Sequence, residues 1–104
     1  MDFQTILTSL PSIEHLSGLD ILANDQVVHH IPAEQGKLGS LRVYNALAQK
    51  FNGKLDRTCA EKGVQLFAEH VLDAKENPGK HPNIDLLLQV IEQNVEYVLV
   101  PILK

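Results

Sequence analysis

Tryptophan is absent from this sequence, and its only aromatic side chains are three phenylalanines and two tyrosines. Proteins that read single-stranded nucleic acids stack the bases on aromatic rings, so this chain has little material for such a platform. Basic residues are also in deficit, because nine Lys and Arg stand against 13 Asp and Glu and give a formal net charge of −4. A phosphate backbone attracts the opposite balance of charge. We therefore expect no nucleic acid among the partners.

Cysteine is nearly absent as well, because Cys59 is the only one. An intramolecular disulfide is therefore excluded, and a reducing compartment fits best. The longest uncharged apolar run, Tyr97 to Leu103, is far below the ~18 residues that indicate a membrane span. The first residues also lack the basic region and the apolar stretch of a secretory signal. We expect a cytoplasmic protein with no membrane partner.

The chain has 104 residues, of which 44% are hydrophobic. This length corresponds to one domain, and this apolar fraction is typical of an ordinary soluble core. We expect residues 1–104 to form a single domain.

The spacing of apolar residues predicts an α+β fold. A helical face lies at positions 3, 6, 7 and 10 and ends at Pro11, and a β-hairpin turns at Asn24 and Asp25. Further helical faces lie in residues 41–51, 57–76 and 84–93, with Ser40, Asp56 and Asn83 as expected N-caps. Residues 95–103 are apolar on both alternating faces and predict a strand. We expect about four helices, the last of them nearly buried, packed on a small, mainly antiparallel sheet formed by the hairpin and this strand.

Five histidines raise the question of a metal site, but their spacing argues against one. His29 and His30 are adjacent in a predicted strand, so their side chains point to opposite faces. His70 and Asp73 share one helical face, yet a zinc site needs at least three protein ligands. Cys59 lies 11 residues before His70, which is roughly 16 Å along a helix, so the two cannot form a catalytic pair. We expect no metal and no cofactor.

None of the catalytic or nucleotide-binding patterns GxSxG, HExxH, CxxC and GxxxxGK[ST] occurs in the chain. Cys59 lacks the surroundings expected of a thiol nucleophile. The sequence therefore names no catalytic residue, although His15, His70 or His81 beside a carboxylate would suit acid–base chemistry.

Two loops have a feature that suits anion binding. Lys37 with Ser40, and Lys80 with His81, lie on Gly-Lys loops that lead into predicted helices. Free backbone N–H groups at a helix start attract anions, and the N–H groups near Ile84 and Asp85 are expected to face such a ligand. Glycines also occur before most helices for backbone reasons alone, which is the alternative explanation. In addition, the Asp85 carboxylate would repel an anion. Lys80, His81, Lys37 and Ser40 are the candidate ligand-binding residues.

The C-terminal strand suggests self-association. A strand that is apolar on both faces needs cover on both, and the helices of so small a domain supply one side fully. We expect a two-fold homodimer through residues 95–103 or the helix before them, although Pro101 weakens edge pairing. Complete cover by the first and last helices is the alternative.

Four segments resemble a family of small bacterial proteins known as domain of unknown function 2322. They are LPSIEHLSGLD (10–20), GKLGSLRVY (36–44), LFAEH (66–70) and NPGKHPNID (77–85). The resemblance implies a bacterial cytosolic protein and brings no activity, cofactor or catalytic residue. We expect a non-enzymatic binding or protein-interaction module that self-associates. The alternative is a small-molecule or anion-binding enzyme or sensor that uses the loop Lys and His residues.

Overall fold

The computed structural model describes residues 2–104, and the predicted α+β fold is confirmed. Five helices and four strands follow one another as α1 (Phe3–Thr8), β1 (Leu16–Ala23), β2 (Gln26–Pro32), α2 (Leu38–Lys50), β3 (Lys54–Leu55), α3 (Arg57–Phe67), α4 (His70–Glu76), α5 (Pro82–Gln93) and β4 (Tyr97–Leu103).

The strands form one antiparallel sheet in the order β2-β1-β4-β3. The hairpin turns where it was expected, because Asn24 and Asp25 both have positive φ angles, of 52° and 65°. Two such residues make the tight turn whose twist matches that of the flanking strands. The C-terminal strand β4 lies in the middle of the sheet, beside β1. The fourth strand, β3, was not predicted, because two residues are too few to show an alternating pattern.

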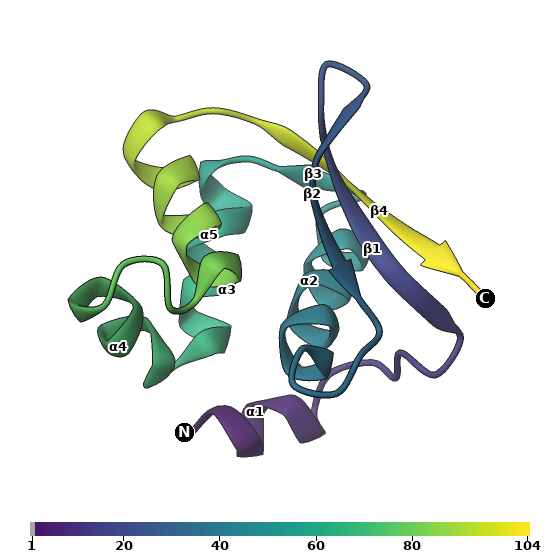
Figure 1. The fold of residues 1–104 in the computed structure, drawn as a ribbon, viewed down its shortest axis with the longest axis horizontal. Coiled ribbons are helices and arrows are strands. Elements are labelled where there is room, and N and C mark those ends of the chain that lie inside the picture. The colour runs from purple at the N-terminus through teal and green to yellow at the C-terminus, as the bar shows by residue number, and fades with distance from the viewer. Residues whose placement is uncertain (1) are drawn as a thin grey trace.

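All helices lie on one side of the sheet (Figure 1). The strand residues on that side are buried, among them Leu19, Ile21, Ile31 and Leu99. Helix α2 packs against β1, β2 and β4, and α3 and α5 pack against each other farther from the sheet. The last helix, α5, buries Ile84, Leu87 and Val90 but leaves its other apolar residues partly exposed, so the expectation of near-complete burial was wrong.

The helix predicted over residues 57–76 is in fact two helices, so the count of four becomes five. Helix α3 ends where Ala68 adopts φ 51°, ψ −123°, a backbone conformation that costs free energy for any residue with a Cβ. Two contacts made after the break account for it. Glu69 accepts a hydrogen bond from the backbone N–H of Phe3 at 2.8 Å, and the His70 ring packs edge-on against the Phe3 ring. Tertiary contacts thus override a continuous helical pattern.

Membrane-spanning helices require ~20 residues. The longest helix that the structure describes, α2, has 13 residues, and no helix within residues 2–104 is long and apolar enough to cross a bilayer.

Candidate functional site

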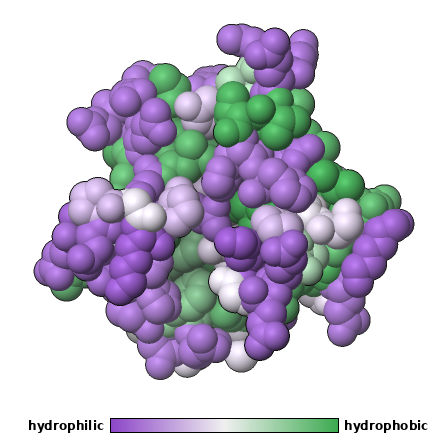
Figure 2. Space-filling view, viewed as in Figure 1, coloured by the Kyte–Doolittle hydropathy of each residue, from purple (hydrophilic) through white to green (hydrophobic). Residues whose placement is uncertain are grey.

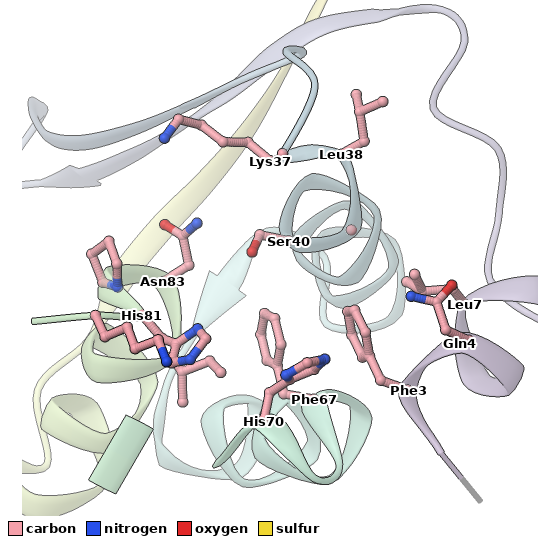
Figure 3. A pocket seen from close by; sticks show the side chains of 15 residues that line it. Phe3, Gln4, Leu7, Lys37, Leu38, Ser40, Phe67, His70, His81 and Asn83 are labelled. Carbon is pink, nitrogen blue, oxygen red and sulfur yellow. The ribbon is translucent and has the colours of Figure 1, made fainter. Parts of the chain in front are cut away.

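A cavity of about 430 Å³ opens where α1, α2, α3 and α4 meet the loop that leads into α5. Small-molecule sites in proteins commonly have volumes of about 300–1,000 Å³. In Figure 3, Lys37 and Ser40 come from the start of α2, and His81 and Asn83 face them from the start of α5. The aromatic rings lie across from Ser40. The lining residues are Phe3, Gln4, Leu7, Gly36, Lys37, Leu38, Gly39, Ser40, Phe67, His70, Lys80, His81, Pro82, Asn83 and Ile84.

Aromatic rings form one wall of the cavity. Phe3 and Phe67 stack with ring centroids 5.6 Å apart and an interplanar angle of 12°. The His70 ring meets Phe3 edge-on, with centroids 4.9 Å apart. Gly39 closes this wall, because a Cβ at residue 39 would lie 3.1 Å from the Phe3 ring. A side chain at residue 39 would therefore press on the Phe3 ring, which would have to shift by a few tenths of an ångström.

The ionisable groups around the cavity are all basic. Lys37, His70, Lys80 and His81 line it, and no Asp or Glu of the described chain is among its lining residues. The whole chain, by contrast, has a formal net charge of −4. Basic side chains gathered around an opening in an acidic protein make a local environment that attracts anions.

Asp73 on α4 lies behind two of these basic groups and fixes their positions. Its Oδ2 atom lies 2.6 Å from Nε2 of His81 and 3.1 Å from Nζ of Lys80, and its Oδ1 accepts a hydrogen bond from Asn77. The hydrogen bond from His81, followed by that from Lys80, lowers the pKa of the Asp73 carboxyl to about 2. The carboxylate therefore stays ionised at any physiological pH. Its bond to Nε2 leaves Nδ1 of a neutral His81 ring as the acceptor nitrogen.

The start of α2 supplies unpaired backbone donors to the same cavity. The helix was expected to begin after Ser40, but Lys37 is its N-cap, and no side chain caps it. The first-turn N–H groups of Leu38, Gly39 and Ser40 therefore have no partner inside the helix. By contrast, α1 and α3 have side-chain caps, because Asp2 accepts a hydrogen bond from the Thr5 N–H and Asp56 accepts one from the Cys59 N–H. An uncapped helix start at a basic cavity favours negative charge.

The start of α5 contributes less than the sequence predicted. Its N-cap is His81 and not Asn83, and the N–H groups of Ile84 and Asp85 both donate to the His81 carbonyl, at 3.0 and 2.9 Å. They do not face the cavity as free donors. Asp85 accepts a hydrogen bond from the Gly79 N–H at 2.9 Å, so its carboxylate stabilises the loop and does not line the cavity.

Asn83 instead connects the sheet to the cavity. Its Oδ1 lies 2.6 Å from Nε2 of His29 on the helix-covered side of β2. Its backbone carbonyl accepts a hydrogen bond from the Tyr44 hydroxyl on α2. Burial raises the pKa of Tyr44 well above its ordinary value, so this hydroxyl remains a donor. These contacts fix the first turn of α5 against both α2 and the sheet.

Comparison with protein-family models identifies one family, DUF2322, described as an uncharacterized protein conserved in bacteria, whose model matches residues 3–101. The chain belongs to DUF2322. The match includes every residue that lines the cavity. Comparison with curated proteins and with solved structures finds no match to this DUF2322 chain.

The four candidate residues of this DUF2322 chain, Lys37, Ser40, Lys80 and His81, all border the one cavity. Their convergence follows from the packing of both α2 and α5 against α3, which no sequence motif indicates. Phe3 and Asn83 also line the cavity, and no local pattern in the sequence indicates this. The spacing of His70 and Asp73 shows that they share a helical face, but it does not show that His81 lies beside both.

The other histidines and the cysteine lie apart from this cavity. His29 and His30 do point to opposite faces of the sheet, toward Asn83 and Asp20 respectively. Cys59 is fully buried, and burial raises the pKa of its thiol to about 12. Within residues 2–104, no three His, Cys, Asp or Glu side chains are placed to hold a metal ion together.

Proposed function

We propose that this protein is a non-enzymatic binding module whose cavity takes a small molecule with an anionic group and an apolar part. The observation that carries the proposal is the lining itself, in which two lysines and two histidines surround an aromatic wall and no carboxylate lines it within the described chain. Such a combination of an apolar surface with a few convergent polar groups is typical of small-molecule sites.

The anionic group would lie between the Lys37 side chain and the backbone of the first turn of α2. There it would meet the Lys37 ammonium, the Ser40 hydroxyl and the uncapped N–H groups of the first turn. Lys80 and His81 would contribute less charge, because Asp73 already pairs with both. The apolar part of the ligand would pack against Phe3 and Phe67.

The test is a titration with inorganic phosphate, followed by phenyl phosphate, monitored by backbone amide shifts. Both anions are expected to shift the amides of residues 37–41 and 79–83 and to saturate, with phenyl phosphate at least tenfold tighter because its ring covers apolar surface. Lys37→Ala should weaken binding more than Lys80→Ala. Lys75→Ala is the matched control, because it removes the same charge from an exposed position on α4 away from the cavity.

Equal weakening by all three substitutions would indicate a general charge effect and contradict the proposal. So would the absence of saturable shifts, or shifts that are equal for the two anions.

A second candidate function is acid–base catalysis by the Asp73–His81 pair. The specific observation in its favour is the contact of 2.6 Å between Oδ2 and Nε2, which orients the imidazole at the cavity as a carboxylate does in many catalytic pairs. Hydrolysis of phenyl phosphate by the wild-type protein, lost in His81→Ala while phosphate still binds, would favour this enzyme over the binding module.

A further inference from the structure

The side of the sheet that faces away from the helices carries three rows of side chains, which we call the outer face. Strand register defines the rows. The first contains Val27, Leu22, Val98 and Lys54; the second contains His30, Asp20 and Val100; the third contains Pro32, Gly18 and Ile102. Seven of these ten residues are apolar or glycine.

No part of residues 2–104 covers the outer face, because every helix lies on the other side of the sheet (Figure 1). Val27, Val98 and Val100 remain 54%, 52% and 39% exposed. Figure 2 shows the resulting apolar surface, in green, below the hairpin tip and along β4. Contiguous exposed apolar surface of this kind marks interaction sites in soluble proteins.

The polar groups of the outer face are already paired with each other. Nδ1 of His30 lies 2.6 Å from Oδ1 of Asp20. Gly18 permits this arrangement, because a Cβ at residue 18 would lie 2.9 Å from Cε1 of the His30 ring. The imidazole therefore lies over Gly18, against β1, and 47% of its side-chain surface stays exposed on this face.

β3 pairs only with Tyr97 and Val98, so the rest of β4 has a free edge on that side. This edge is a poor docking site compared with the outer face. The Leu99 N–H points toward the β3 side, where it donates to the Gly53 carbonyl at 2.7 Å. Alternate residues of a strand direct their N–H groups to the same side, so residue 101 would present the next donor, and it is proline. Where β4 extends past β3, the missing N–H of Pro101 therefore disfavours the addition of another strand. A partner is therefore expected on the face of the strand and not on its edge.

We infer that the outer face binds the outer face of a second copy of this chain, as a two-fold sheet-on-sheet dimer. A two-fold axis parallel to the strands, between β1 and β4, places Leu22 opposite Val98 of the second copy, and Asp20 opposite its Val100. No like charges then oppose each other. A nucleic acid or an anionic bilayer would instead select basic residues, whereas this face has one acid and one histidine at its centre.

The size of the face predicts a weak dimer. Three strands at ~4.8 Å spacing and three rows over ~20 Å give a footprint of roughly 300 Å² per copy, well below the ~800 Å² of a standard interface. An interface of this size belongs to the weak, transient class, so the dimer is expected to be populated only toward the millimolar end of the concentration range.

The test is sedimentation equilibrium of the full chain from 10 µM to 1 mM, with Val98→Lys and Val100→Lys compared with the wild type. Each substitution is expected to weaken dimerisation at least tenfold without changing the circular dichroism spectrum, because both side chains are exposed in the monomer. Leu72→Lys is the matched control, since it adds the same charge at an apolar residue that is 64% exposed on α4. It should leave dimerisation unchanged.

Dilution of the wild-type protein gives a readout that does not depend on how the variants fold. Amide shifts that depend on concentration are expected to cluster in residues 18–30 and 98–102. A monomer throughout the concentration range, a dimer insensitive to both β4 substitutions, or shifts confined to other elements would overturn the inference.

Discussion

Replacing Gly63 with alanine sets two opposing effects against each other in the packing of α2, α3 and α5. Alanine is favoured over glycine inside a helix by about 1 kcal/mol. However, a Cβ at residue 63 would lie 2.7 Å from Cδ1 of Leu87 and 2.9 Å from Cδ1 of Leu47. Both distances are about 1 Å inside the ~3.5–4.0 Å optimum between carbon atoms. Leu47 and Leu87 are fully buried, so neither methyl group can rotate into solvent.

The relative size of these two effects decides whether Gly63→Ala stabilises or destabilises the protein. Overpacking of a core costs about 1–3 kcal/mol, which exceeds the gain in helix propensity. We expect Gly63→Ala to lower the free energy of unfolding by about 1 kcal/mol and the melting temperature by about 4–8 °C. Urea denaturation followed by circular dichroism measures the difference.

A double substitution identifies the cause. Leu47→Ala alone should cost about 2–5 kcal/mol, because it leaves a cavity. In the Leu47→Ala background the 2.9 Å contact is gone, and the Leu87 methyl group that lies 2.7 Å from the new Cβ can shift into the vacated space. Gly63→Ala should therefore become neutral or stabilising. A stabilisation of about 1 kcal/mol in the wild-type background would refute the reasoning, because helix propensity alone would then account for it.

Three further predictions concern single groups. The Asp73 carboxyl should titrate near pH 2 by carbon NMR, and in His81→Ala its pKa should rise toward the ordinary 3.8. Because its pKa is lowered in the folded protein, the stability that this carboxylate contributes is present above about pH 4 and is lost as the pH falls toward 2. Tyr44→Phe removes the hydrogen bond to the Asn83 carbonyl and should cost about 1 kcal/mol in urea denaturation, and an unchanged stability would show that this contact is dispensable. The Cys59 thiol, with its pKa raised to about 12, should react with iodoacetamide at pH 9 only as fast as the protein unfolds, whereas rapid alkylation would contradict its burial.

The elements that sequence reasoning located correctly are those with a strong local cause. Asn24 and Asp25 tolerate positive φ, so their turn could be predicted. The apolar spacing located the first helix, although α1 ends at Thr8, three residues before Pro11. The break at Ala68 has no such signal, because its causes, the contacts of Glu69 and His70 with Phe3, come from 65 or more residues earlier in the chain. Long-range contacts of this kind leave no mark in a local window.

The candidate site likewise contains some residues that a single sequence segment indicates and others that depend on tertiary packing. Lys37 and Lys80 could be named because Gly-Lys loops before helices have a physical meaning within one segment. Ser40 and Asn83 were wrongly expected to be N-caps, and the Asn83 side chain instead pairs with His29 on a distant strand. The two loops meet at one cavity because α2 and α5 both pack against α3. Apolar periodicity and turn chemistry do not predict this tertiary arrangement.

The pairing of β1 with β4 has a consequence for how the chain folds. Residues 16–22 must find residues 98–103, so the centre of the sheet closes a loop of nearly the whole chain. Contacts this distant in sequence slow folding, because the entropy of loop closure is lost before the contacts form. Contacts among the intervening helices, such as those of α3 with α5, join residues that are closer in sequence and can form earlier. Before β4 pairs with β1, the β1–β2 hairpin exposes an unpaired strand edge. Because such edges can pair with other chains, we expect aggregation mainly during refolding at high protein concentration.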